Sequence, residues 1–249
     1  LSTTNLNSHI KYANPDFCDI AGFTLAEMQD SPHNIVRHPD MPKEAFTDLW
    51  SNIQAGKSWM GPVKNKCKDG DYYWVNAFVT PIKDEHGNIT EYQSVRTHLD
   101  DAVKSRATST YQKLRSGKVP QSVKKSTDLT QWIPLAIILQ LLLSLFGFAN
   151  RESGLWLTIP SLVIAAVGCG IYFVWKRKYN KVIAYAKSIC DNPLMAYLYS
   201  GDSDITSLIQ FALKKRTAEL GAVVGRVLDD SEVVRNIAKE SCDSGNSVE

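Results

Sequence analysis

The sequence lacks the short motifs by which most enzyme and metal sites are recognised. None of the patterns GxGxxG, GxxxxGK[ST], HExxH or GxSxG occurs in its 249 residues. The five cysteines are odd in number and show no CxxC spacing, which argues against both a disulfide framework and a zinc site. We therefore expect a protein that is not an enzyme and has no metal site.

An excess of charge of one sign is also missing. The 28 Lys and Arg residues face 26 Asp and Glu residues, so the formal net charge is +2. Proteins that hold nucleic acid through its phosphates carry a clear excess of basic residues. The balance therefore predicts no nucleic-acid partner.

Charge is missing altogether from two long apolar runs, residues 132–149 and 155–175. As helices they would reach about 27 and 31 Å, enough to cross a bilayer, and a buried hairpin in a soluble core is the alternative. Neither run holds an ionisable side chain of the kind that transport pathways use, so a channel or transporter is disfavoured. We expect two transmembrane helices.

Basic residues flank these runs on their outer sides. Lys118, Lys124 and Lys125 precede the first run, and a group from Lys176 to Lys181 follows the second, whereas the connecting residues 150–154 hold one Arg and one Glu. The positive-inside rule then places both termini in the cytoplasm and 150–154 in a short extracytoplasmic loop. Five residues cannot enclose a ligand, so sensing is expected inside the cell.

The first hundred residues alternate helix-like and strand-like stretches. The pattern predicts a strand, two short helices, a longer helix and three strands, over residues 9–14, 15–23, 25–29, 42–54, 60–68, 72–83 and 89–98. Thr24 and Glu27 have the spacing of a capping box for the second helix. The last three strands form an antiparallel meander, with Tyr73, Val75 and Ala77 on the same face.

Three stretches and the membrane hairpin together resemble the bacterial aerotaxis receptor family, flavin-binding PAS chemoreceptors. The stretches are NPDFCDIAGFTLAEM (14–28), HNIVRHPDMP (33–42) and GKSWMGPVKNKCKDGDYYWV (56–75). The resemblance runs from about residue 1 to the segment after the second span. It implies an α+β PAS domain over residues 1–100, an antiparallel sheet with helices on one side, in a protein of the bacterial inner membrane.

The same resemblance implies that the domain binds FAD. Positions matching Arg37, His38 and Asp40 are tied to FAD in the family, and those matching Asn14 and Asn65 less firmly. Arg37 suits phosphate oxygens, whereas His38, Asp40 and Asn65 suit hydroxyls or the ring edge. Trp50, Trp59 and Tyr73 are aromatic candidates for the pocket wall. In an arbitrary protein, Arg37 and Asp40 would instead be a surface pair beside an exposed His38.

The sequence also leaves alternatives to FAD open. His38 is also a candidate axial ligand of haem, which would make the domain a gas sensor. The segment before the long helix has no cysteine for a photochemical flavin adduct, so a redox input is favoured. A PAS module without a cofactor, used only for dimerisation, is a third possibility.

The rest of the chain is expected to transmit a signal. Residues 101–131 are predicted to be a linker, and residues 176–249 resemble the helices of a HAMP domain followed by the start of a signalling helix. Leu213, Leu220, Val227 and Val234 recur every seven residues, as in a coiled coil. The proline usual near the start of the first HAMP helix is missing between 176 and 189.

Together these patterns predict a homodimeric redox or oxygen sensor, in which the state of FAD is passed from the PAS domain to HAMP-like helices. The resemblance implies a chemotaxis histidine kinase and its coupling protein as partners. They would be reached through an output module that we expect to lie outside these 249 residues.

Overall fold

The computed structural model describes residues 1–120, 128–149 and 155–246, without the side chains of 147–158, 240 and 242–246. The expected extracytoplasmic loop, 150–154, lies outside the described residues. The chain divides into two compact units, one of residues 1–120 with 213–249 and one of residues 121–212.

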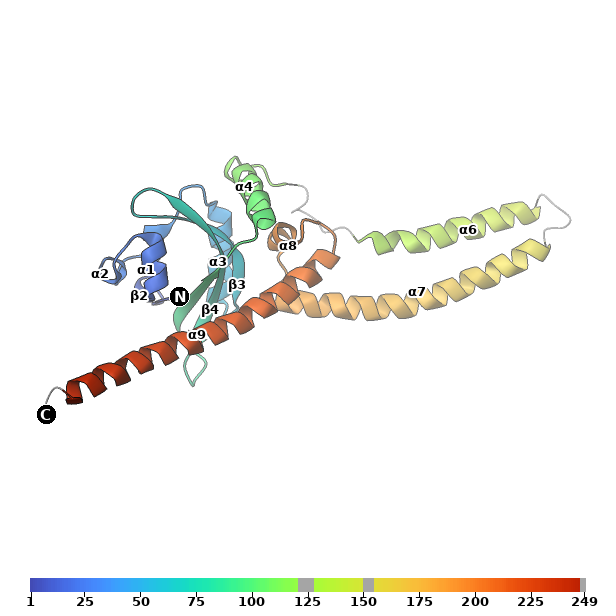
Figure 1. Ribbon diagram of the computed structural model, residues 1–249. Coiled ribbons are helices and arrows are strands. Elements are labelled where there is room, and N and C mark those ends of the chain that lie inside the picture. Colours follow the sequence, from blue (N-terminus) through green and yellow to red (C-terminus); the bar gives the residue numbers. More distant parts are fainter. Residues whose placement is uncertain (121–127, 150–154, 247–249) are drawn as a thin grey trace. The chain divides into compact units, whose positions relative to one another are not determined.

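The first unit is built on a five-stranded antiparallel sheet in the order β2-β1-β5-β4-β3 (Figure 1). The strands are β1 (Ser2–Thr4), β2 (Ile10–Ala13), β3 (Trp59–Lys66), β4 (Tyr72–Lys83) and β5 (Ile89–Thr97). The β3-β4-β5 meander and the strand at β2 confirm the prediction. The three-residue strand β1 was not predicted, because it is too short to show an alternating pattern.

The helices that precede β3 lie together beside the sheet (Figure 1). They are α1 (Pro15–Ala21), α2 (Leu25–Met28), the 3-10 helix η1 (His33–Val36) and α3 (Lys43–Gln54). Thr24 and Glu27 form the predicted capping box at the start of α2. Gly56, with φ of 74°, follows Ala55, the C-cap of α3, at a position where the left-handed conformation favours glycine. This arrangement confirms the PAS fold.

Helix α4 (Asp101–Arg115) occupies the first half of the segment expected to be a linker. Val103, Ala107, Tyr111 and Leu114 recur at helical spacing and are buried, which explains why a stretch of mostly polar residues packs. The Tyr111 ring stacks on Trp74, and its hydroxyl donates to the Pro62 carbonyl oxygen at 2.9 Å. Trp74 points away from the face of Tyr73 and Val75, so α4 covers the sheet face opposite to that of the preceding helices.

The second unit contains two long apolar helices that lie side by side (Figure 1). Helix α6 (Trp132–Ala149) follows the 3-10 helix η2 (Leu129–Gln131) and has the bounds predicted for the first span. Helix α7 (Leu155–Ile189) continues past the second predicted span. Both helices are long and apolar enough to cross a membrane.

Helices α8 (Pro193–Ser200) and α9 (Thr206–Asn246) complete the chain. Residues 182–198 have helical spacing throughout, but the structure divides them between the end of α7 and α8. Pro193 lacks an N–H and restricts the residue before it, and Asn192 caps the new helix by accepting from the Met195 N–H at 3.0 Å. Asp204 caps α9 in the same way, through the Ser207 N–H.

Candidate functional site

A cavity of about 140 Å³ lies between the sheet and the helices that precede β3. Its walls are mostly apolar and come from α3 and from the inner face of β3, β4 and β5. The lining residues are Thr4, Ser8, His33, Asn34, Val36, Arg37, Phe46, Leu49, Trp50, Ile53, Val63, Asn65, Val75, Ala77, Val79, Tyr92, Ser94 and Arg96. Of the residues predicted for a cofactor, Arg37, Trp50 and Asn65 are therefore at the cavity.

Strand register explains which side chains reach the cavity. Val75, Ala77 and Val79 alternate along β4 and share the inner face, as predicted. In the β4-β5 ladder Ala77 faces Arg96 and Val79 faces Ser94. Residues directly opposite each other in a ladder point to the same side of the sheet, so β5 brings a charged residue onto an otherwise uncharged face.

Arg96 places a positive charge at the cavity. Its guanidinium lies 3.9 Å from the centre of the Phe17 ring and donates to the Ser2 hydroxyl at 3.0 Å. Burial lowers the pKa of Arg96 to about 10, so the group stays protonated at neutral pH. Within the described residues it makes no ion pair with a carboxylate. The cavity therefore contains a positive charge that no described carboxylate balances by direct contact.

His33 is the nearest hydrogen-bonding partner of this charge. Its Nε2 atom lies 2.7 Å from Arg96 Nη2, and its ring stacks on Phe17. Burial, and then the Arg96 charge, lower the pKa of His33 to about 3. The imidazole is therefore neutral at physiological pH, with Nε2 accepting from Arg96.

Asn65 and Arg37 meet where β3 passes the end of η1. Their backbones form an isolated antiparallel bridge, so two segments far apart in sequence are held together at the cavity. The Asn65 side chain is buried, and the Arg37 guanidinium lies 4.0 Å from the centre of the Phe46 ring. Both residues supply hydrogen-bond donors beside the apolar wall.

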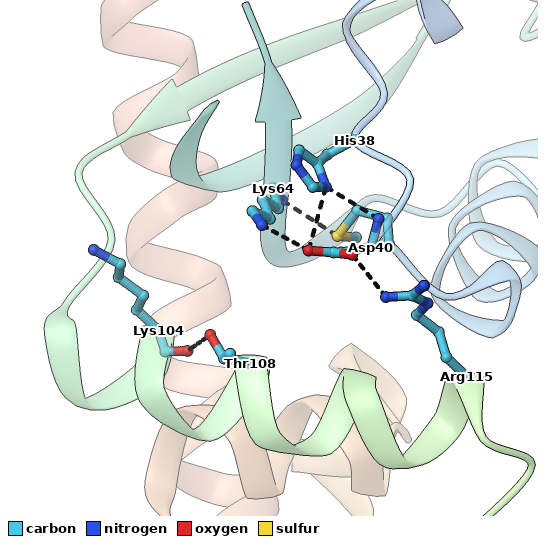
Figure 2. A network of polar contacts seen from close by, with 7 residues as sticks. His38, Asp40, Lys64, Lys104, Thr108 and Arg115 are labelled. Atoms are coloured by element: carbon cyan, nitrogen blue, oxygen red, sulfur yellow. Dashed lines mark hydrogen bonds and ion pairs between the residues drawn. The ribbon is translucent and has the colours of Figure 1, made fainter. Parts of the chain in front are cut away.

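Next to the cavity, Asp40 is the centre of a polar cluster that we call the rim: His38, Asp40, Lys64 and Arg115 (Figure 2). Lys64 Nζ and Arg115 Nη1 each lie 2.7 Å from an oxygen of Asp40. The bond from Lys64 is the main reason why the pKa of Asp40 is lowered. His38 Nδ1 accepts from the Asp40 N–H at 3.0 Å, and burial followed by the Lys64 charge lowers the pKa of His38. None of these four residues lines the cavity itself.

The remaining predicted residues lie away from the cavity lining. Trp59 is buried and donates from Nε1 to Asp48 Oδ2 at 2.7 Å, joining β3 to α3. Asn14 is the N-cap of α1, where its side-chain oxygen accepts from the Phe17 N–H. Tyr73 packs against the helical core, and its hydroxyl is buried. Burial raises the pKa of this hydroxyl.

Sequence reasoning missed Arg96, His33 and Arg115. The alternation of Tyr92, Ser94 and Arg96 along β5 contains the necessary signal for Arg96, because it places a cation at a position of the inward-facing set. Arg115 has no such signal, since it lies far along the chain from the residues it contacts.

Residues 10–96 match a protein family described as the PAS fold. Over 125 residues the chain is 44% identical to the aerotaxis receptor of Escherichia coli (strain K12), a stretch that covers 50% of this chain and 24% of that receptor. It is 27% identical over 99 residues to the nitrogen fixation regulatory protein of Klebsiella pneumoniae, covering 40% of this chain and 20% of that protein. The alignments thus span about a quarter or less of these relatives.

Solved structures show similarity to somewhat less than half of the chain. The dark structure of the blue-light photoreceptor Aureochrome1 LOV matches with a TM-score of 0.40 and 20% identity, covering 46% of this chain and 84% of that one. A light-oxygen-voltage domain studied with a flavin analogue matches with a TM-score of 0.39 and 18% identity, covering 47% and 85%.

Proposed function

We propose that this aerotaxis-receptor-like PAS protein is a redox or oxygen sensor that binds FAD in the cavity between its helices and its sheet. The observation that carries the proposal is the Arg96 cation at an apolar cavity, which forms no ion pair among the described residues, with the buried Asn65 amide on the neighbouring wall. An apolar pocket with a few converging polar groups is typical of a site for a flat heteroaromatic ligand. A plain hydrophobic core would not retain an arginine at this position.

The residues that line the cavity have the chemistry to bind a flavin. The cavity itself would have to widen to hold one. Val75, Ala77 and Leu49 offer apolar surface for the faces of a ring system, whereas Arg96 and Asn65 offer donors to its polar edges. Ligand pockets usually enclose about 300–1,000 Å³, more than the cavity of about 140 Å³. Trp50 and Phe46, both on α3, are the large side chains whose rotation would widen it.

A bound flavin supplies reversible electron uptake, which changes the charge and hydrogen bonding of its ring nitrogens. The protein's response would begin at Arg96 and His33. Arg96 would attract added negative charge at the cavity, and that charge would raise the pKa of His33 from its lowered value. A changed hydrogen bond between these two side chains would then shift η1 and β5, which carry them.

The remaining parts of the proposal concern location and output. We propose that α6 and the first part of α7 anchor the protein in the bacterial inner membrane, with both termini in the cytoplasm. Helices α8 and α9 would act as a HAMP-like element of a homodimer. Chemotaxis kinase and coupling protein would be the eventual partners, as the similarity to an aerotaxis receptor suggests.

The test is an absorption spectrum of the full chain purified in mild detergent, with the released cofactor identified by chromatography. We expect the two bands of an oxidised flavin and release of FAD. Arg96→Met and Arg37→Ala should lower the flavin content at least about tenfold, because each removes a charged hydrogen-bond donor at the site. Lys43→Ala, an exposed position at the start of α3, is the control.

Other spectra would point to other functions. A Soret band would replace flavin by haem and reopen the question of which histidine is its ligand. A protein that stays colourless after incubation with FAD would favour a PAS module that serves only in dimerisation. Flavin content that is equal in all three variants would show that the cavity is not the binding site.

A further inference from the structure

We propose that a groove on α7 binds an anionic phospholipid of the cytoplasmic leaflet, with an acyl chain along Gly170 and Val174 and the phosphate at Lys178. This inference rests on the proposed membrane anchoring and adds a lipid site to it. The ligand class is a phospholipid with a net negative headgroup, and phosphatidylglycerol is the probe. Three features of α7 support the site: the shape of the groove, its depth in the span and the charges beside it.

The groove has a volume of about 390 Å³, and its described lining comes from α7 alone. Gly170, Ile171, Val174, Trp175 and Lys178 line it, so an apolar floor ends at a cation. The floor is open at Gly170, because a Cβ atom at this position would meet empty space. A ligand that fits this groove has an apolar part and an anionic end.

The groove lies on the side of α7 that is turned away from α6 and η2. On the packed side, Ser161 Oγ lies 2.9 Å from Ser144 Oγ, and the Tyr172 hydroxyl donates to the Thr130 carbonyl oxygen at 3.2 Å. Val174 follows Tyr172 by two residues, about half a turn, and its side chain is more than half exposed. No side chain from another described element lines the groove, so in a bilayer this face of α7 would contact lipid.

The groove crosses the cytoplasmic end of the second predicted span. The apolar run ends at residue 175, and the positive-inside rule places that end at the cytoplasmic surface. Gly170 and Val174 therefore lie at the depth of the acyl chains, Trp175 at the boundary where tryptophan is enriched, and Lys178 at the headgroups. A lipid in the groove would keep its chain and its phosphate at the depths that they have in the bilayer.

The charges beside the groove are all positive. Helix α7 contains four lysines, one arginine and no carboxylate. Lys176 points toward η2, where its Nζ lies 2.7 Å from Asp128 Oδ2. Arg177, Lys178 and Lys181 lie within about one turn of each other and form no ion pair in the described part of the chain. An anionic headgroup would balance this charge, whereas a zwitterionic one would not.

Trp175 makes the site observable, because bromine atoms on an acyl chain quench tryptophan fluorescence only at short range. The full chain is prepared with Trp132→Phe and Trp156→Phe, which leaves Trp175 as the only tryptophan after residue 74. The tryptophans of the PAS domain lie outside the bilayer in the proposed topology and give a constant background. Brominated phosphatidylglycerol or brominated phosphatidylcholine is then titrated into phosphatidylcholine vesicles that hold the protein.

We expect brominated phosphatidylglycerol to quench Trp175 at a mole fraction at least about fivefold lower than brominated phosphatidylcholine. Lys178→Gln should lower this preference about fivefold, because one lysine near the membrane surface contributes about that factor. Lys187→Gln is the matched control, since it removes the same charge from an exposed position of the same helix outside the groove. Its preference should stay within about twofold of wild type.

Gly170→Leu tests the groove itself, because the added side chain would occupy the open space at its floor. The preference for phosphatidylglycerol should be lost, although both lipids still quench Trp175. Gly168→Leu is the control, since a side chain there also meets open space but lies outside the groove. This variant should keep the wild-type preference.

Three results would overturn the inference and leave the membrane anchoring intact. One is equal quenching by the two lipids in the wild type. Another is an equal loss of preference in Lys178→Gln and Lys187→Gln, which would show attraction to the net charge of the helix and no defined site. The third is a weakened homodimer in Gly170→Leu with unchanged lipid preference, which would assign the groove to a second copy of α7.

Quenching by neither lipid would show that α7 does not enter the bilayer. The proposed anchoring and the lipid site would then fail together. The flavin content of the same preparation reports on the sensor proposal independently of both.

Discussion

Arg96 Nη2 and His33 Nε2 lie 2.7 Å apart at the wall of the cavity, so a strand and a 3-10 helix from opposite layers of the domain share one hydrogen bond. The contact requires a neutral imidazole, because a protonated His33 would have no acceptor to offer and would repel the guanidinium. Burial is the main reason why the pKa of His33 is lowered to about 3, and the Arg96 charge adds to it. The protonation state of His33 is thereby linked to the stability of the domain.

The first prediction is that His33 makes the protein less stable as the pH is lowered below about 6.5. The ordinary pKa of 6.5 applies in the unfolded chain and a value of about 3 in the folded one. Between these values only the unfolded state binds the proton, so acid favours unfolding, at up to about 1.4 kcal/mol per pH unit. Urea unfolding followed by tryptophan fluorescence at pH 7, 6 and 5 measures this dependence.

His33→Gln is the variant that isolates this contribution, since it keeps an acceptor for Arg96 and does not titrate. Its free energy of unfolding should fall less than that of the wild type between pH 7 and pH 5, with a difference of at most about 2 kcal/mol. Identical pH dependence in the two proteins would mean that His33 already protonates freely in the folded state.

The second prediction separates a structural from a binding role for Asn14. Asn14→Ala should lower the free energy of unfolding by about 1 kcal/mol, because the Phe17 N–H loses its capping acceptor. Asn14→Ser should recover most of this loss. Neither change should alter the dissociation constant of FAD, because Asn14 is not among the residues that line the cavity. A serine variant that is stable but binds FAD poorly would assign Asn14 to the ligand.

Local signals in the sequence predicted much of the PAS fold. The capping box of Thr24 and Glu27, the amphipathic pattern of α3 and the alternation in β4 each depend on neighbours a few residues away, and each corresponds to an element of the structure. The sequence pattern did not distinguish helix α4 from a linker, because the burial of this helix depends on packing against Trp74 and Pro62 of distant strands.

The residues of the candidate site were likewise predicted only in part. Arg37, Trp50 and Asn65 were selected from residues and resemblance, and the structure places all three at the cavity. Arg96 was passed over because one cation in a strand is ordinarily assigned to the solvent face. Its inward position follows only from the pairing register with β4.

The third prediction concerns the attachment of α4. Tyr111→Phe removes the donor to the Pro62 carbonyl and leaves that buried oxygen unpaired. The free energy of unfolding should fall by about 1–2 kcal/mol. Amide exchange in residues 101–115 should accelerate more than exchange in β5. Tyr72→Phe is the matched control, since Tyr72 is exposed, and an equal loss of stability in both variants would show that the hydrogen bond is not the cause.

The fourth prediction concerns self-association through α9. Leu213, Leu220, Val227 and Val234 follow a seven-residue repeat along this helix, and each side chain is more than half exposed. Such a continuous apolar seam is typical of a helix that packs against a partner helix. In the proposed homodimer this partner is α9 of a second copy.

A charge placed in this seam should oppose dimer formation. Leu220→Glu combined with Val227→Glu should weaken the dimer at least about tenfold, because each glutamate would have to be buried next to its copy or keep the helices apart. Thr217→Glu, at an exposed position of the same helix outside the repeat, should have little effect. Sedimentation velocity in detergent, with cross-linking through single cysteines introduced along α9, distinguishes the outcomes. A dimer that persists in the double variant with unchanged cross-links would exclude the α9 seam as the interface, and association would then have to be sought in the apolar helices α6 and α7.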